Sequence, residues 1–174
     1  MKKPPLLPEE TLHRVLRMAN FNGLSVLAIS GMLTLAVAAS GDYVGAVIGL
    51  LVAASGAIEL HGAGLLRAGE SRGMRWLIAS QPYLAVIVLA YCGLRLMDYD
   101  PSEIRRVMTE ERRAQIAALG YDQATFEHMY YVSIYAILGI STLIYQGAMT
   151  VYYGRRRRAV TQALGMEEES PRFN

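Results

Sequence analysis

The chain has 174 residues, of which 53% are apolar and 18% carry a charged side chain. Soluble domains have about 45–50% apolar and about 25% charged residues, so this composition favours a membrane protein. The length excludes a large multidomain enzyme, and the single cysteine, Cys92, excludes an intrachain disulfide and a cysteine-based metal site.

Residues 1–20 are predicted to form a cytoplasmic amphipathic segment. A helix is expected to begin near Pro8, and its apolar residues recur at helical spacing while basic side chains face elsewhere. The apolar positions are Leu12, Val15, Leu16 and Ala19. We expect this helix to lie on the membrane surface, as interfacial helices do.

Four apolar stretches follow, at residues 21–40, 43–66, 76–97 and 129–153. About 20 apolar residues in a helix cross a hydrocarbon core of ~30 Å, so each stretch is long enough to span a membrane. Residues 21–97 are therefore predicted to hold the first three transmembrane helices and residues 126–158 the fourth. The predicted fold is all-α, a polytopic membrane protein with a bundle of four transmembrane helices.

Residues 98–125 are charged and are predicted to form a short amphipathic helical segment outside the membrane. Asp100 and Pro101 are typical of a helix start, Gly120 of a helix end, and Asp122 of a cap on the next helix. Residues 159–174 are assigned to a cytoplasmic tail, and the composition from Gly165 onward is typical of disorder.

The basic residues predict the orientation, because lysine and arginine are retained on the cytoplasmic side. With both termini cytoplasmic, twelve basic residues lie inside and five outside. We therefore expect an integral protein of the plasma (inner) membrane with both termini in the cytoplasm. Aromatic residues near the span ends fit a belt at the two interfaces; they are Tyr43, Trp76, Tyr130, Tyr131, Tyr152 and Tyr153.

Glu59 is an ionisable residue within the second apolar stretch, where it costs ~2.5 kcal/mol or more without a partner. Gly45, Gly49 and Gly56 share its helical face and would let another helix approach closely. Glu59 is therefore expected to face protein. It either joins two helices through a hydrogen bond or acts directly on an ion or substrate.

Other polar residues fall at the same depth as Glu59, in the inner third of their spans. These residues are Ser25, Ser80, Gln81, Tyr145 and Gln146. Pro82 lacks an N–H, so it frees the carbonyl of Ile78 at this level. Polar side chains in membrane bundles usually join helices by hydrogen bonds, yet this layer is the best candidate for an ion site.

His61 is two residues from Glu59, about 200° around the helix, so the two cannot serve one metal ion as an i, i+4 pair. No metal site is predicted, and His61 is expected to pack or to lie at the inner interface. Arg155, Arg156, Arg157 and Arg158 are assigned as a topology anchor that can also bind acidic lipid headgroups.

The sequence has no P-loop, HExxH, GxSxG or dinucleotide-binding motif, so no enzyme activity and no cofactor are predicted. Its expected partners are the lipid bilayer and either a second copy or another membrane protein, with no nucleic acid. We therefore expect a protein that acts through helix association, as a homo-oligomer or as a subunit of a larger assembly. One alternative is a channel or transporter with a proton or cation site around Glu59, and a weaker one is an intramembrane or lipid-modifying enzyme that uses Glu59 and His61.

Overall fold

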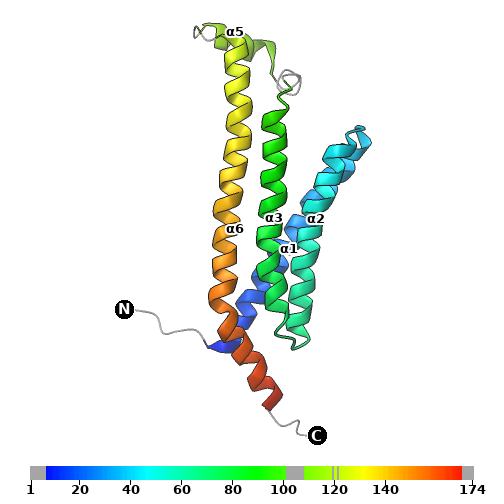
Figure 1. Cartoon of the computed structure of the whole chain (residues 1–174), viewed down its shortest axis with the longest axis vertical. Helices are drawn as coiled ribbons and strands as arrows, with labels where there is room; N and C mark the ends of the chain where they lie inside the picture. The colour runs from blue at the N-terminus through cyan, green and yellow to red at the C-terminus, as the bar shows by residue number, and fades with distance from the viewer. Residues whose placement is uncertain (1–6, 101–107, 119, 121, 170–174) are drawn as a thin grey trace, which may run out of the picture. The chain divides into compact units, whose positions relative to one another are not determined.

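The computed structural model describes residues 7–100, 108–118, 120 and 122–169. These residues form helices and no strand (Figure 1); the helices are α1 (Pro8–Ala39), α2 (Tyr43–Arg67), α3 (Gly73–Met97), α5 (Glu110–Ala118) and α6 (Gln123–Glu169). Four of them, α1, α2, α3 and α6, are long and apolar enough to cross a membrane. The all-α prediction with four candidate transmembrane helices is thus confirmed.

A tight turn joins α1 to α2, and Figure 1 shows the two helices side by side. Gly41 has φ +85°, a backbone conformation that side chains with a Cβ rarely adopt. Asp42 then caps α2, because its carboxylate accepts a hydrogen bond of 2.8 Å from the Gly45 N–H. The Gly41-Asp42 sequence therefore produces a helical hairpin.

The N-terminal segment differs from the prediction of a separate helix on the membrane surface. Residues 8–20 belong to the same continuous helix as the first span, α1. Val15 and Ala19 on its apolar face are completely buried. This face packs against apolar side chains of α2, α3 and α6.

The helices fall into two compact units, which we describe separately. Unit 1 comprises Met1–Ile87 and Tyr145–Asn174, and unit 2 comprises Val88–Ile144. Unit 1 holds a core to which four helices contribute; its members include Val15, Ala19, Ala63, Leu66, Met74, Leu77, Met149, Tyr153 and Val160. The core therefore ties α1 and α2 to the first part of α3 and the last part of α6.

Large apolar side chains cover the outer surface of α1 and α2, whereas several polar side chains are buried. The exposed apolar residues include Leu24, Ile29, Met32, Leu33, Val44, Val47 and Leu50. A contiguous exposed apolar surface of this kind is typical of contact with lipid. The distribution agrees with an integral membrane protein.

Unit 2 is organised around aromatic side chains of α3 and α6. Tyr131 is buried, and its hydroxyl donates a hydrogen bond of 2.9 Å to the Arg95 carbonyl. The ring centroids of Tyr91 and Tyr135 lie 5.9 Å apart. Tyr131, which was predicted for the interfacial belt, packs inside this unit, where its hydroxyl finds a backbone acceptor.

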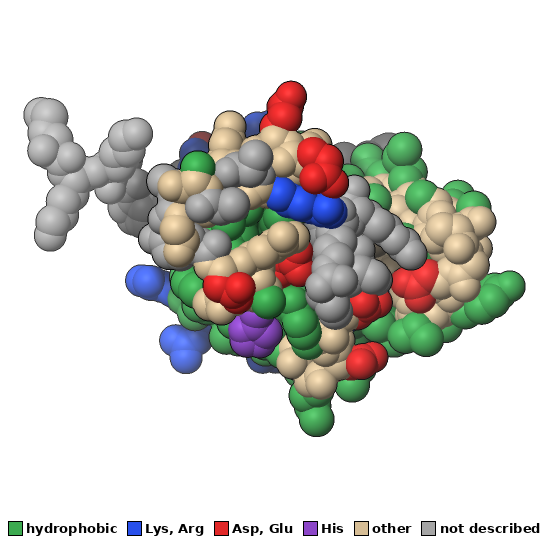
Figure 2. Space-filling model, turned by 90° about the horizontal axis from the view of Figure 1, so that it is seen from above, with side chains coloured by type: hydrophobic (Ala, Val, Ile, Leu, Met, Phe, Trp, Pro, Cys, Tyr) green, Lys and Arg blue, Asp and Glu red, His purple; other side chains and the backbone are tan. Residues whose placement is uncertain are grey.

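The segment between α3 and α6 contains one described helix, α5. A helix start was predicted at Asp100 and Pro101, and residues 101–107 lie outside the described part of the chain. Asp122 caps α6 as predicted, since its carboxylate accepts 2.9 Å and 3.0 Å hydrogen bonds from the N–H and hydroxyl of Thr125. Figure 2 shows acidic side chains on the face that carries α5.

The fourth apolar stretch is part of a helix longer than predicted. α6 runs from Gln123 through the four arginines to Glu169, beyond the Gly165 at which disorder was expected. Val160, Ala163 and Leu164, which follow the arginines, are buried in the core of unit 1. Packing of these residues extends the helix beyond the apolar stretch.

Candidate functional site

The carboxylate of Glu59 is the centre of a buried polar network in unit 1. Its side chain is only 2% exposed. Asn22 Nδ2 of α1 donates to Glu59 Oε2 at 2.6 Å, and the Tyr153 hydroxyl of α6 donates to Oε1 at 2.5 Å. One carboxylate on α2 therefore joins three helices.

Tyr145 extends this network through Asn22. Its hydroxyl donates a hydrogen bond of 2.8 Å to Asn22 Oδ1. Tyr145 and Tyr153 are eight residues apart, slightly more than two turns, so they project from the same side of α6. We refer to Asn22, Glu59, Tyr145 and Tyr153 as the Glu59 network.

Two neighbouring residues on α3 supply further buried polar groups. Gln81 Nε2 donates to the Ser80 hydroxyl at 3.0 Å, and that hydroxyl donates to the Leu77 carbonyl at 3.0 Å. Gln81 is itself buried, with 1% of the residue exposed. The polar layer predicted from helix depth thus gains a contribution from α3.

Among the described residues of unit 1, two amide oxygens are buried without a hydrogen-bond partner: Gln81 Oε1 and Gln146 Oε1. A buried unpaired acceptor costs roughly 1–3 kcal/mol, and such groups commonly point to water or an ion that satisfies them. Together with the Glu59 carboxylate, they place three oxygen-bearing side chains in the interior. This interior is rich in acceptors and poor in positive charge.

The structure brings together most of the residues predicted for this layer. Glu59 and Tyr145 share the network, and Ser80 and Gln81 are hydrogen-bonded to each other. Ser25 is half-buried and makes none of the hydrogen bonds found among the described residues. It therefore has no place in the network.

Sequence reasoning missed Asn22 and Tyr153, the two residues that bind Glu59 directly. Tyr153 was assigned to the interfacial belt, but it is completely buried because its hydroxyl reaches Glu59. Asn22 precedes Ser25 by three residues and so lies one turn earlier in α1. A polar amide at the second position of the first apolar stretch was the available signal.

The glycines predicted to allow close packing do so within the chain, between α1 and α2. A Cβ added to Gly56 would lie 2.6 Å from the carbonyl oxygen of Gly23 and 2.8 Å from the Leu27 nitrogen. Gly49 faces the side chain of Thr34, and Gly45 faces the side chains of Asp42 and Val37. Close approach of these backbones holds Asn22 against Glu59.

His61 lies outside the Glu59 network. Its imidazole makes an edge contact with the indole ring of Trp76, with the centroids 5.3 Å apart. This contact agrees with the predicted packing role.

The four arginines also lie apart from the network on α6, where the Arg156 guanidinium stacks 3.7 Å over the Tyr152 ring.

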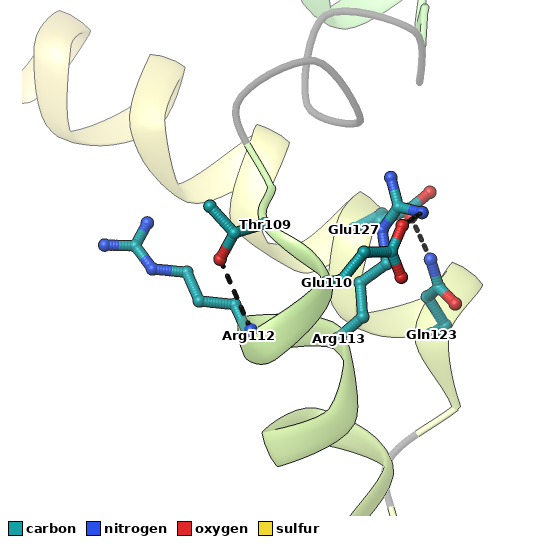
Figure 3. A network of polar contacts seen from close by, with 6 residues as sticks. All are labelled: Thr109, Glu110, Arg112, Arg113, Gln123 and Glu127. Atoms are coloured by element: carbon teal, nitrogen blue, oxygen red, sulfur yellow. Dashed lines mark hydrogen bonds and ion pairs between the residues drawn. The ribbon is translucent and has the colours of Figure 1, made fainter.

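Unit 2 contains a second buried acid, Glu127, whose neighbours are shown in Figure 3. Gln123 Nε2 donates to Glu127 Oε1 at 2.8 Å. Arg113 of α5 pairs with Glu110 at 3.0 Å, and its side chain points toward Glu110 and Glu127. A basic side chain is thus present near this acid, in contrast to Glu59.

Within the described residues, no group of three or more His, Cys, Asp or Glu side chains could hold a metal ion. No protein-family model, no curated protein and no solved structure matches the chain.

Proposed function

We propose that the chain is a small four-span membrane protein that binds a cation, either a proton or a monovalent metal ion, at Glu59. The main support for the proposal is the charge of the Glu59 carboxylate, which needs to be balanced. Glu59 is buried, and the described side chains that donate hydrogen bonds to it are the neutral ones of Asn22 and Tyr153. A negative charge inside a membrane protein needs a positive partner, which a bound cation supplies.

The donors around Glu59 support reversible binding of such a cation. Asn22 and Tyr153 hold the two carboxylate oxygens in fixed positions, so the group does not need to rearrange when its charge changes. The unpaired oxygens of Gln81 and Gln146 offer further ligands, and amide oxygens suit monovalent metal ions and water alike. This arrangement favours the channel or transporter alternative.

Infrared difference spectroscopy of the full chain in liposomes tests this proposal. One titration varies pH without metal salts, and another adds sodium or potassium at constant pH. A pH-dependent carboxyl band identifies a proton, and a salt-dependent carboxylate band identifies a metal ion. Either band must disappear in Glu59→Gln and persist in Glu127→Gln, which alters the buried acid of unit 2. A Glu59 signal that responds to neither titration would overturn the proposal.

A flux measurement separates binding from transport. Liposomes that contain the wild-type chain should pass protons or the metal ion identified above, and Glu59→Gln should abolish the flux. Tyr153→Phe removes one donor and keeps the carboxylate, so it should reduce the flux without abolishing it. Binding without flux would limit the function of the Glu59 network to cation binding.

We propose helix association with a second copy as the other candidate function. The glycines on which it first depended are used between α1 and α2, so it ranks second. Gly147 and Gly154, seven residues apart on α6, support it, because no atom lies within 4 Å of a Cβ added at either position. Native mass spectrometry in mild detergent should detect a dimer or larger ring, and a strict monomer would exclude this candidate.

A further inference from the structure

The last part of α6 carries an open groove of about 540 Å³ in unit 1. Its described lining residues are Gly154, Arg157, Arg158, Thr161 and Gln162. They occupy positions i, i+3, i+4, i+7 and i+8 of the helix, so they share one face. The groove begins directly after the apolar stretch, at the depth where lipid headgroups are expected.

The arginines of this run differ in what their side chains contact. Arg156 is engaged, since its guanidinium stacks on Tyr152 and donates to the Tyr152 carbonyl. Arg157 and Arg158 are exposed, line the groove, and form no ion pair with any acidic side chain among the described residues. Two guanidinium groups are therefore available to an anion in the groove.

The donors in the groove suit a phosphate group. Guanidinium groups bind phosphate oxygens through paired N–H donors, and the Gln162 amide adds another donor. The Thr161 hydroxyl already donates to the Arg157 carbonyl at 3.0 Å, which leaves phosphate binding to the two arginines and Gln162. The chemistry at this end of the groove is that of an anion site.

At Gly154 the groove is open and the same helix face continues into the apolar stretch, which favours a lipid over a free phosphate ion. Gly154 leaves space, since no atom lies within 4 Å of a Cβ placed there. On the preceding turns of the same face, Gly147 and Val151 are exposed. An acyl chain can lie along this surface while its headgroup lies between the arginines.

We propose that this groove binds one anionic phospholipid, with the phosphate held by Arg157 and Arg158 and an acyl chain along Gly154 and Val151. The proposal is independent of the cation site, because the groove shares no residue with the Glu59 network, and it competes with helix association for the face of α6 that carries Gly154. Basic pockets at the cytoplasmic ends of transmembrane helices bind anionic headgroups in this way. The arginine run would then both anchor the topology and select a lipid.

Native mass spectrometry of the full chain with equal amounts of phosphatidylglycerol and phosphatidylcholine tests the proposal. The wild-type chain should retain phosphatidylglycerol preferentially. The double variant Arg157→Gln/Arg158→Gln should lower this preference at least about tenfold, since each basic group at an anionic leaflet contributes measurably to binding. The matched control Arg155→Gln/Arg156→Gln removes the same charge outside the groove and should retain most of the preference.

A second variant tests the shape of the groove without a change in charge. Gly154→Leu fills the open space and should also lower phosphatidylglycerol retention, while gel filtration verifies that each variant is folded. If the two double arginine variants lost the preference for phosphatidylglycerol to the same extent, the proposal would be overturned, because general charge attraction would then explain binding. Inorganic phosphate that binds as tightly as phosphatidylglycerol would overturn the lipid assignment.

Discussion

The Tyr153 hydroxyl donates a hydrogen bond of 2.5 Å to Glu59 Oε1, although the two residues are 94 positions apart in the chain. Both side chains are buried in unit 1. A long-range polar contact of this kind fixes how α6 is rotated against α2, because other rotations would leave the carboxylate without this donor. The same contact supplies a donor to the proposed cation site.

Tyr153→Phe should therefore destabilise the protein. The substitution keeps the ring in the core but leaves Asn22 as the one hydrogen-bond donor to Glu59 among the described residues. Loss of a hydrogen bond to a buried acidic group costs about 1–3 kcal/mol, with the lower part of this range typical of membrane proteins. Thermal unfolding in detergent would measure the effect.

Tyr152→Phe is the matched control for this variant. The neighbouring Tyr152 uses its ring to hold Arg156, and its hydroxyl makes no hydrogen bond among the described residues. Loss of the Tyr152 hydroxyl should therefore change the unfolding temperature little. Equal destabilisation by the two variants would contradict a special role for the Tyr153 hydroxyl.

Gly56→Leu should disrupt the pairing of α1 with α2. A side chain at this position meets backbone atoms of Gly23 and Leu27, and backbone cannot move aside as a flexible side chain can. Overpacking of this kind typically costs about 1–3 kcal/mol, and more when helices must separate. Thermal unfolding of the detergent-solubilised chain measures the cost.

Gly31→Leu and Gly64→Leu provide controls on α1 and α2. Neither glycine has an atom within 4 Å of an added Cβ, so both variants should unfold close to the wild-type temperature. If they were as damaging as Gly56→Leu, a general loss of helix flexibility would explain the result better than close packing.

The sequence predicted the helices well because span length and hydropathy are local properties. Residues 43–66 and 76–97 correspond closely to α2 and α3. The course of residues 8–20 was predicted less well, since an apolar helical face suits a membrane surface and a protein surface equally. Only the tertiary structure determines that Val15 and Ala19 meet the core.

The candidate site was predicted in part for a similar reason. Glu59 stands out because a carboxylate is costly in an apolar span, whatever surrounds it. Its partners depend on which helices adjoin α2 and how each is rotated, and neither property can be obtained from residue depth alone. Tyr153 therefore resembled a belt residue, and Asn22 was overlooked.

The predicted orientation can be measured with reporters fused within the described parts of the chain. A reporter in the α2–α3 turn, near Glu70, should be cytoplasmic, and one near Glu111 in α5 should be outside, because twelve of the 17 basic residues favour this arrangement. The opposite result at both sites would mean that the orientation is the reverse of the predicted one. Two cytoplasmic signals would mean that α3 does not cross the membrane.

The cap at the start of α6 should depend on pH. Hydrogen bonds from the backbone and side chain of Thr125 hold the pKa of Asp122 below its usual value. A carboxylate whose pKa is lowered on folding stabilises the folded state fully at pH values above its unfolded pKa of ~3.9. This stabilisation is lost as the pH falls through the lower pKa of the folded state. Amide exchange of Thr125, corrected for intrinsic rates, should accelerate in this acidic range. The variant Asp122→Asn can still cap the helix but does not titrate, so it should remove the pH dependence of the Thr125 amide exchange. If the exchange of this variant still accelerated in acid, another titrating group would be responsible.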